Sequence, residues 1–352
     1  MNLTSDSLSV IAHPPRLTVV ICTYNNADVL AQTLAHLEAQ CTDERLEFDT
    51  LVIDNNCRDH TPAVIAAVRE RGRLRHLHHF VETRQGQVFA RVRGVMESRT
   101  EWIAFVDDDN LLQPGWIQGA LAFITAHPGC GAFGGRIQIE WEAPPTPTIE
   151  RHNYAYARLD LGRVAKKLEG EARWHLRGAG LVCRKQALVA SGWLDWQVCV
   201  GRVGGVTTSG DDLEMVMRIA REGYEIWYEP ACHMRHLISA SRISQHYLEK
   251  LHFGFGLAEP ILRGLKKRQS FAAWLGDLLL GFVQRFGKAV KLYTVAVFRR
   301  QERERARVHW AYFRGMLTGL RPALRLRPEV RRGWLGQNSS GGAPLLRTPA
   351  SV

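Results

Sequence analysis

The sequence has no long apolar run and no paired cysteines. No stretch of about 18 consecutive apolar residues occurs in the 352-residue chain, so no transmembrane helix is expected. The first residues, MNLTSDSLSVIAHPP, have neither a basic segment nor an apolar one, so no secretory signal is expected either. The seven cysteines are scattered and none forms a CxxC pair, which argues against a zinc ribbon or a redox motif. We therefore expect a protein of a reducing compartment, the cytoplasm.

The composition is that of a globular protein, but its charge is unevenly distributed. Hydrophobic residues make up 45% and charged residues 23% of the chain, which excludes collagen-like, low-complexity and wholly disordered classes. Residues 1–256 hold 27 basic and 30 acidic side chains, whereas residues 257–352 hold 19 basic and 5 acidic ones. Such a basic block favours an anionic partner, a membrane surface or a nucleic acid, and a solvated helical face is the open alternative.

Strand-like and helix-like segments alternate from residue 16 onward. Short apolar runs predict strands at 17–22, 51–54, 74–80 and 102–106. Apolar residues at helical spacing predict helices at 29–37 and 88–96, and a further helix is expected to begin near Thr61. This alternation predicts an α/β fold with a mostly parallel sheet flanked by helices. Ligands in such sheets bind beyond the carboxyl ends of the strands, where polar clusters are candidate sites.

The rest of the chain suggests a division into four parts. These are a tail at 1–15, an α/β domain at 16–256, a basic amphipathic helical region at 257–330 and a disordered tail at 331–352. Within the second part, residues 141–160 are rich in proline, polar and aromatic residues and predict a long loop or lid. Within the third part, residues 271–286 and 288–298 predict two amphipathic helices.

The strongest chemical signal is the acidic run Asp107, Asp108 and Asp109, followed by Asn110, directly after a predicted strand. Adjacent carboxylates repel one another, which destabilises the fold. A bound divalent cation removes this repulsion, because hard cations prefer oxygen ligands. Magnesium-type ions are held by one or two carboxylates together with substrate phosphates. An acidic turn in front of a helix near Pro114 is the open alternative.

A second acidic cluster, Asp211 and Asp212, stands at the start of a predicted helix. A carboxylate in that place can act as a general base on an incoming hydroxyl, and plain helix capping is the alternative. Residues 201–210 contain four glycines, which predicts a mobile loop over a site.

Three shorter groups carry weaker signals. The histidines of Cys232-His233-Met234-Arg235-His236 can bind metal, but two histidines alone are more typical of a structural role. The groups Thr23-Tyr24-Asn25 and Asp54-Asn55-Asn56 follow predicted strands. A tyrosine there can stack on a base and a carboxylate can accept a hydrogen bond from ribose, whereas turn formation is the alternative.

Taken in order, these motifs carry a resemblance. The segments VVICTYNN, LVIDNNCRDHT, AFVDDDN, SGDDLEMVMRIAREGY and PACHMRH resemble a family 2 glycosyltransferase over residues 16–256. The resemblance implies a GT-A fold that binds a nucleotide sugar. The segment VETRQGQVFARVRG also matches a part of the family that borders the nucleotide.

The resemblance also implies which residues form the site. The residues that it implies line the nucleoside pocket or border the nucleotide are Thr23, Tyr24, Asn25, Asp54, Glu82, Arg84 and Arg91. Those assigned to the ribose, phosphate and sugar are Asp107, Asp108, Gly178, Ala179 and Gly180. Asp109 matches the metal ligand and His236 a late histidine that helps to bind metal or diphosphate. Asp212 matches the catalytic base and Asp211 the acidic position beside it.

The resemblance implies inverting transfer that depends on Mn2+ or Mg2+. The donor is then a nucleoside diphosphate sugar, by family most often UDP-linked, and the acceptor a saccharide or a lipid-linked molecule. The sequence has no QxxRW motif, which favours transfer of a single sugar over polymerisation. Two positions depart from the family pattern. Arg93 stands where asparagine is common, and Asp211 stands where glutamate is common. These departures leave the subfamily undetermined but not the family.

Two other functions are alternatives to this reading of the motifs. A nucleotidyltransferase would need a glycine-rich basic phosphate loop, and CTYNNADVL has neither glycine nor lysine. A binding module for a nucleotide sugar or a membrane surface, without catalysis, is the second alternative. No nucleic-acid-binding module is visible, so no nucleic acid partner is expected. We expect the basic C-terminal region to dock on an anionic membrane at its cytoplasmic leaflet, or else to pack on the catalytic domain or a second subunit.

Overall fold

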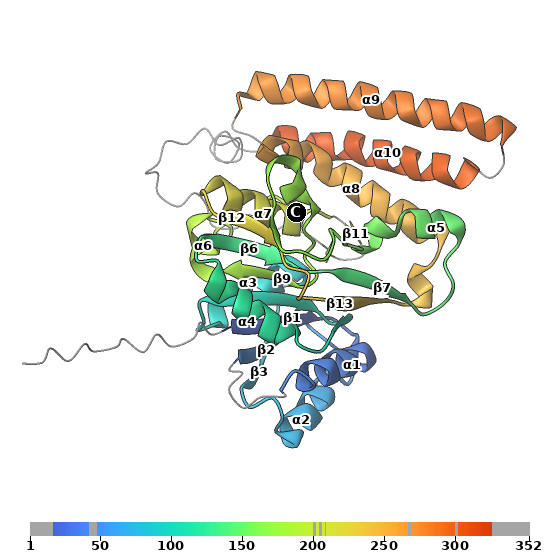
Figure 1. Ribbon diagram of the computed structural model, residues 1–352. Helices are drawn as coiled ribbons and strands as arrows, with labels where there is room; N and C mark the ends of the chain where they lie inside the picture. The colour runs from blue at the N-terminus through green and yellow to red at the C-terminus, as the bar shows by residue number, and fades with distance from the viewer. Residues whose placement is uncertain are drawn as a thin grey trace, which may run out of the picture.

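The computed structural model describes residues 17–41, 48–199, 202–203, 206–207, 209–266, 269–299 and 302–325. A central sheet carries helices on its faces, and three long C-terminal helices form a further layer on one side (Figure 1). The expected tails at 1–15 and 331–352 lie outside the described residues, as does most of the glycine-rich segment 201–210. Of that segment the backbone of two short paired strands is described, β10 (Arg202–Val203) and β11 (Val206–Thr207).

The central sheet has eight strands in the order β3-β2-β1-β4-β9-β6-β12-β8. Its parallel half consists of β1 (Leu17–Thr23), β2 (Phe48–Asp54), β3 (Leu77–Val81) and β4 (Trp102–Asp107). The other half consists of β6 (Cys130–Gly134), β8 (Lys166–Lys167), β9 (Leu181–Arg184) and β12 (Glu225–Tyr228). β12 runs parallel to β6, while β9 is antiparallel to both β4 and β6. The sheet is therefore mostly parallel, and the predicted α/β class is confirmed.

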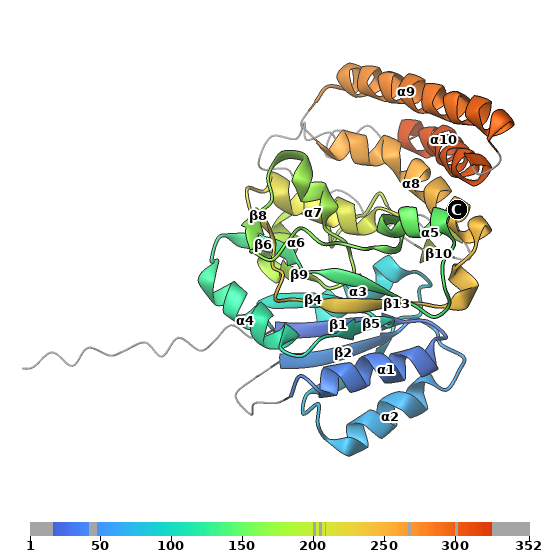
Figure 2. The same ribbon diagram turned by 45° about the vertical axis from the view of Figure 1, so that its right-hand side comes forward.

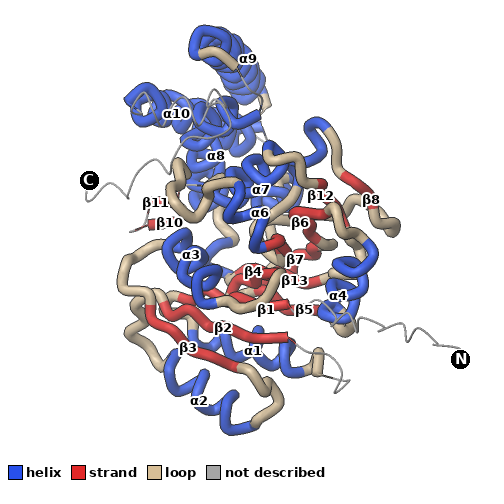
Figure 3. The backbone as a smooth tube through the Cα atoms, turned by 90° about the vertical axis from the view of Figure 1, so that its left-hand side faces the viewer, coloured by secondary structure: helices blue, strands red, loops and turns tan. Residues whose placement is uncertain are grey.

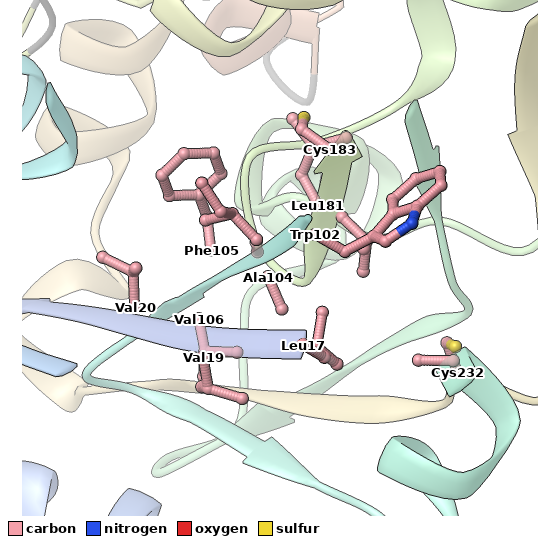
Figure 4. Packing of buried hydrophobic residues seen from close by; sticks show 14 of the residues in the cluster. Leu17, Val19, Val20, Trp102, Ala104, Phe105, Val106, Leu181, Cys183 and Cys232 are labelled. Atoms are coloured by element: carbon pink, nitrogen blue, oxygen red, sulfur yellow. The ribbon is translucent and has the colours of Figure 1, made fainter. Parts of the chain in front are cut away.

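Apolar strand residues form the core between the sheet and its helices. Leu17 and Val19 of β1 and Trp102 and Phe105 of β4 are almost completely buried, and Figure 4 shows them packed with Leu181 of β9. Strands buried on both faces read as continuous apolar runs, which is why the sequence pattern located β1 and β4 to within one residue. The third strand begins three residues later than predicted, since only the end of 74–80 pairs with β2.

Helices connect the strands and cover the sheet (Figure 3). They are α1 (Ala27–Glu38), α2 (Thr61–Arg71), α3 (Gln87–Glu97), α4 (Trp116–Ala126), α6 (Lys185–Ala190) and α7 (Asp211–Arg221). α3 packs on β1 and β2, where Gly94 meets the side chain of Val20 so closely that a Cβ atom would clash. This contact places the first turns of α3 at the carboxyl ends of the parallel strands.

A second, three-stranded sheet brings a distant segment to the acidic run. β13 (Met234–Ile238) pairs antiparallel with β5 (Asn110–Leu112) and parallel with β7 (Ile137–Trp141). In this register His236 lies opposite Asn110. The late histidine is thus fixed beside the aspartates that precede β5.

The segment 141–160 is not the long loop that its composition suggested. It contains the helix α5 (Pro147–Arg151) and the 3-10 helix η1 (Asn153–Tyr156). The hydroxyl of Thr146 accepts a hydrogen bond from the backbone N–H of Ile149, and Pro147 occupies the first helical position. A cap and a proline thus start a helix too short to show a period in the sequence.

The C-terminal region forms three helices, α8 (Gln245–Lys266), α9 (Phe271–Phe298) and α10 (Arg303–Arg325). α9 is one helix where two were predicted, because a helical glycine, Gly287, continues it without a break. α8 crosses the expected boundary at residue 256. The region packs on the α/β part of the chain through a buried cluster that joins Met217 of α7 to α8, α9 and α10.

The described residues also contain two short 3-10 helices, η2 (Gly170–His175) and η3 (Ala240–Arg242). α9 is the outermost helix, and α8 lies between it and the α/β body (Figure 2). None of the helices in the described ranges has the length and apolar character needed to cross a bilayer.

Candidate active site

A cavity of about 840 Å³ opens beyond the carboxyl ends of β1 and β4. Its walls come from the loops after these strands, from the start of α7, from η1, and from α8 with single residues of α9 and α10. The predicted site residues that line it are Thr23, Tyr24, Asn25, Arg91, Asp107, Asp108, Asp109, Gly178, Ala179, Asp211, Asp212 and His236. The fold therefore gathers side chains more than 200 positions apart in the sequence around one space.

Asp108 is held by three elements at once. Its carboxylate accepts hydrogen bonds from the hydroxyl of Thr23 (2.7 Å) and the amide of Asn26 (2.9 Å). Its backbone carbonyl accepts one from the hydroxyl of Thr33 in α1 (2.7 Å). Burial and the neighbouring Asp109 raise the pKa of Asp108 to about 7. Because these hydrogen bonds hold Asp108 in place, they fix the end of β4 and the loop after it, which carry Asp107 and Asp109.

Asp109 faces a histidine and an arginine. Its Oδ1 lies 3.3 Å from Nε2 of His236, and its Oδ2 accepts a hydrogen bond of 2.8 Å from Arg242 at the end of η3. Although burial acts in the opposite direction, these two partners hold the pKa of Asp109 well below its usual range. The Nδ1 of His236 lies 2.8 Å from the carbonyl oxygen of Tyr156. Because a carbonyl only accepts, Nδ1 carries a proton and Nε2 is directed at Asp109.

The donor chemistry at Asp109 and His236 fits the divalent cation that the resemblance implies. A carboxylate oxygen and an imidazole nitrogen fixed by a second hydrogen bond are ligands suited to Mn2+. Within the described parts of the chain, no group of three or more His, Cys, Asp or Glu side chains forms a complete metal site. Asp109 and His236 would hold the ion together with phosphate oxygens of a substrate.

Arg91 joins the two acidic clusters. Its guanidinium donates to Asp211 (2.8 Å) and to Asp107 (3.3 Å), and its side chain is almost fully buried. Despite that burial, the two carboxylates hold the pKa of Arg91 above its usual value. Burial raises the pKa of Asp211 to about 6 in spite of the arginine. Asp211 is thus occupied in an ion pair, whereas Asp212 beside it has no ion pair with any of the described residues.

Asp212 presents its carboxylate to the cavity from the first turn of α7. Its Oδ2 accepts a hydrogen bond from the backbone N–H of Gly178 (2.7 Å), and its Oδ1 accepts one from the N–H of Leu213 (2.8 Å). Gly178 is wedged between Asp212 and Arg91, where a Cβ atom would lie 3.1 Å from Cβ of Asp212 and 2.8 Å from Nη2 of Arg91. Each carboxylate oxygen of Asp212 keeps a lone pair that can accept a hydrogen bond from a ligand. The two backbone N–H groups fix the orientation of the carboxylate.

Only some of the residues expected to bind the nucleoside line the cavity. Tyr24 is exposed at 52% and is free to stack on a ring. Asp54, Glu82, Arg84 and Gly180 lie outside the cavity lining. Glu82 and Arg84 form an ion pair with each other (2.9 Å), and Asp54 accepts a hydrogen bond from the N–H of Cys57 (2.7 Å).

Several cavity residues are not among those to which the sequence assigned a site role. Asn55 ties the two loops together, since its amide donates to the carbonyls of Glu82 and Arg84 and its oxygen accepts from Gly86. Asn55 and Asn26 stand in motifs already noted, so closer attention to the asparagines would have found them. Arg242, Tyr154 and Arg177 have no such signal, because only the tertiary fold brings them to the cavity.

Comparison with known proteins agrees with this geometry. Residues 18–187 match the family model described as glycosyl transferase family 2. Pre-mycofactocin glycosyltransferase of Mycobacterium tuberculosis is 26% identical over 225 residues, which cover 62% of this chain and 42% of that protein. This chain thus spans less than half of that relative's length. Glucosyl-dolichyl phosphate glucuronosyltransferase of Haloferax volcanii is 22% identical over 279 residues, covering 76% of this chain and 84% of that protein.

Two solved structures share the fold. A mannosyltransferase from Pyrobaculum calidifontis, in complex with GDP-Man and Mn2+, superposes with a TM-score of 0.55 at 17% identity and covers 88% of both chains. TarS 1–349 of S. aureus, in complex with UDP-GlcNAc, gives a TM-score of 0.52 at 15% identity and covers 92% of this chain and 79% of that one. These likenesses establish the GT-A fold. Together with the curated relatives, the family match places residues 18–187 of this chain in glycosyl transferase family 2.

Proposed function

We propose that this protein catalyses the inverting, metal-dependent transfer of a single sugar from a nucleoside diphosphate sugar to an acceptor hydroxyl. The observation that carries the proposal is that Asp212, held by two backbone N–H groups, shares one cavity with the Asp109–His236 pair. A base for the acceptor and ligands for the donor's diphosphate are thus available at the same place. The bound GDP-Man and UDP-GlcNAc of the two structural neighbours support a donor of this class.

The reaction proposed is a single displacement. The acceptor hydroxyl gives its proton to Asp212 while its oxygen attacks the anomeric carbon. The bond from that carbon to the phosphate oxygen breaks on the opposite face, and the diphosphate leaves with the electron pair. One displacement inverts the anomeric configuration. Asp109 and His236 would hold a divalent cation, which, when bound, would supply positive charge for the leaving diphosphate.

The remaining residues orient the donor. Tyr24 and Asn25 offer a ring and an amide to the base, for which we propose uracil on the family resemblance. Asp107 and Asp108 border the ribose and phosphates, and Gly178 and Ala179 leave room for the sugar. Arg91 keeps Asp107 and Asp211 paired, so that neither carboxylate faces the diphosphate unneutralised.

Slow hydrolysis of the donor tests this proposal without knowledge of the acceptor. UDP- and GDP-sugars are incubated with the enzyme and Mn2+, and proton NMR follows the anomer first released. With an α-linked donor the proposal expects the β-sugar before mutarotation sets in. Release of the α-sugar contradicts inversion. No release from any donor that binds tightly would favour the alternative of a binding module without catalysis.

The biological setting proposed is the assembly of a polysaccharide or glycolipid. A succinoglycan biosynthesis protein of Rhizobium meliloti is 33% identical over 101 residues, and the Haloferax relative is named for a dolichyl phosphate-linked sugar. Both names support a saccharide or lipid-linked acceptor. All seven cysteines are free thiols, which fits our expectation that the protein works on the cytoplasmic side.

We propose an anionic membrane surface as a further partner, because α9 carries an uncovered apolar stripe. Its outward side chains recur every three or four residues along the helix, and α9 is the outermost helix in every view (Figures 1–3). The exposed residues of this stripe are Leu275, Leu279, Leu280, Val283, Phe286, Val290, Tyr293, Val297 and Phe298. Lys288, Lys291 and Arg299 belong to the same segment and suit anionic headgroups.

Flotation with liposomes tests the membrane proposal. We expect the protein to float with vesicles that contain phosphatidylglycerol, and Leu279→Glu with Val283→Glu to abolish flotation. Met96→Glu, at an exposed apolar position of α3, is the matched control and leaves flotation unchanged. If the wild-type protein stays at the bottom and elutes as a dimer that the α9 substitutions dissociate, a second copy rather than lipid covers the stripe.

A further inference from the structure

Arg242 is an arginine of the cavity wall to which the proposed reaction gives no role. It ends η3, and its Nη1 donates a hydrogen bond of 2.8 Å to Oδ2 of Asp109. Its side chain is 27% exposed, so the guanidinium is largely withdrawn from water. Although burial acts against the charge, Asp109 raises the pKa of Arg242 above its usual value. The ion pair of Arg242 with Asp109 is therefore a built part of the cavity wall.

The other oxygen of Asp109 is engaged as well. Oδ1 accepts a hydrogen bond of 3.1 Å from the amide of Asn110 and lies 3.3 Å from Nε2 of His236. Both oxygens of the proposed metal ligand thus have partners, and one of these partners carries a full positive charge. A divalent cation at Asp109 would have to share the single negative charge of the carboxylate with Arg242. Two cations beside one buried carboxylate repel each other.

The other carboxylates of the acidic clusters do not offset this repulsion. Asp107 and Asp211 share the guanidinium of Arg91, at 3.3 and 2.8 Å. The carboxylate of Asp108 accepts hydrogen bonds from two neutral side chains, at the end of β1 and before the start of α1. A further source of negative charge is needed to neutralise both cations. The diphosphate of a donor supplies it, and phosphate oxygens bind a guanidinium as well as a metal ion.

Tyr156 fixes the backbone of the segment that carries His236 and Arg242. Its hydroxyl donates a hydrogen bond of 3.2 Å to the backbone carbonyl of Arg242, and its own carbonyl oxygen lies 2.8 Å from Nδ1 of His236. Its ring packs against those of Trp141 and Tyr247, with centroid distances of 5.0 and 6.1 Å. Because Tyr156 binds the backbone of Arg242, a change of side-chain conformation is enough to break the ion pair while η3 keeps its place.

We propose that Arg242 competes with the divalent cation for Asp109, and that the donor's diphosphate ends the competition by drawing the guanidinium to its own oxygens. Arg242 thereby makes the affinities for the cation and for the nucleotide depend on each other. The proposal rests on the proposed function, because it takes Asp109 as a metal ligand and a nucleoside diphosphate as part of the donor. It gives a role to an arginine for which the sequence offers no signal.

Binding of Mn2+ tests the competition without any turnover. Electron paramagnetic resonance measures free Mn2+ in titrations of the wild-type protein, alone and with saturating UDP or GDP. We expect a nucleotide that binds to tighten Mn2+ binding at least about tenfold. Equal Mn2+ affinity with and without a bound nucleotide would overturn the proposal.

Arg242→Gln distinguishes competition from support of Asp109. We expect this variant to bind Mn2+ alone at least about fivefold more tightly than the wild-type protein, since one of the two cations is gone. The gain in Mn2+ affinity from the nucleotide should shrink by at least about fivefold as well. If Arg242 only holds Asp109 in position, the variant binds Mn2+ more weakly, and the proposal is overturned. Unchanged binding of Mn2+ alone overturns it too.

Two further variants serve as controls. Arg242→Lys keeps the positive charge and should stay close to the wild-type protein in both titrations. Arg136→Gln removes an arginine from an ion pair with Asp160 (3.1 Å) outside the cavity lining, and should leave Mn2+ binding unchanged. The hydrogen bond from Tyr156 to the backbone of Arg242 does not depend on the side chain. Circular dichroism checks that each variant is folded, and the wild-type titration tests the proposal even if Arg242→Gln is not.

Failure of the proposed function would look different. In that case the wild-type chain binds no nucleoside diphosphate, with or without Mn2+. The competition proposal fails by itself when the wild-type protein binds a nucleoside diphosphate together with Mn2+, but Arg242→Gln binds Mn2+ alone no more tightly than the wild-type protein does.

Discussion

Nη1 of Arg91 donates a hydrogen bond of 2.8 Å to Oδ2 of Asp211, and both side chains are buried. The same guanidinium reaches Asp107 at 3.3 Å, so one arginine of α3 links the end of β4 to the start of α7. Asp212 is the next residue after Asp211. The direction in which the proposed base points therefore depends on a pair of charges that do not themselves react.

Replacement of Arg91 by methionine should destabilise the protein strongly. The variant leaves Asp107 and Asp211 without their cation, and breaking a buried ion pair in this way costs about 3–5 kcal/mol. Urea unfolding monitored by circular dichroism measures the loss. Adding Asp211→Asn to Arg91→Met should recover part of the stability, because the stranded carboxylate is then neutral. No recovery in the double variant would mean that Arg91 acts through packing alone.

Replacement of Asp212 by asparagine should remove the base while keeping the size of the side chain. We expect donor hydrolysis to fall by about 100-fold or more, the usual contribution of a general base. The affinity for the nucleoside diphosphate should stay within about threefold, since Asp212 does not contact it in the proposed arrangement. Asp28→Asn, on the exposed surface of α1, is the control. Hydrolysis by Asp212→Asn at the wild-type rate contradicts the assignment.

The sequence predicted those strands and site residues whose signal lies within a single short segment. Buried apolar runs located β1 and β4, and the acidic residues after β4 and at the start of α7 marked two parts of the cavity. Both signals are local, because a strand end and a helix start are fixed by their own residues. The pairing of Asp109 with Arg242 is not local, since it requires β13 to lie beside β5.

The helical wall could not be predicted for the same reason. Nothing in the spacing of α8 indicates that Leu251 and Phe255 face the cavity, because that depends on how the helix docks on α7 and η1. The apolar pattern predicted two helices, 271–286 and 288–298, whereas α9 runs through Gly287 as one helix. A glycine is tolerated there because nothing else among the described residues lies within 4 Å of the position its Cβ would take.

Acid should destabilise the protein through His252. Its Nδ1 donates to the carbonyl of Leu248 (3.0 Å) and its Nε2 accepts from the hydroxyl of Tyr154 (3.0 Å), so the neutral ring is fully satisfied. Burial, with a smaller effect of His152, lowers the pKa of His252 from 6.5 to about 4. The unfolded chain therefore binds the proton more readily, and stability falls as the pH drops from 6.5 toward 4.

The size of this effect follows from the shift in pKa and is on the order of 3 kcal/mol. Unfolding free energies measured in urea between about pH 7 and pH 4.5 should fall less in His252→Gln than in the wild-type protein, by roughly 2 kcal/mol. His60→Gln, at an exposed site, should follow the wild-type curve. Identical pH curves for wild type and His252→Gln would show that this histidine does not titrate as the structure implies.

Two glycines of the helical layer should respond in opposite ways to alanine. A Cβ atom on Gly256 of α8 would collide with the backbone carbonyl of Tyr312 in α10, so Gly256→Ala should cost about 1–3 kcal/mol. Gly287 of α9 has no atom within 4 Å of the added Cβ position. Gly287→Ala should raise stability by about 0.5–1 kcal/mol, because alanine favours the helix. Thermal unfolding compares them, and equal effects would contradict the close contact of α8 with α10.

Binding of nucleoside diphosphates tests the central claim most directly. Calorimetry on the purified chain would compare UDP, GDP, ADP and CDP, each with Mn2+ and with a chelator, for the wild-type protein and Asp109→Ala. We expect one diphosphate to bind the wild-type protein tightly with Mn2+, and both the chelator and Asp109→Ala to weaken that binding by at least about tenfold. Binding that is equally tight with the chelator would contradict the role of Asp109 and His236, and a folded protein that binds none would contradict the account as a whole.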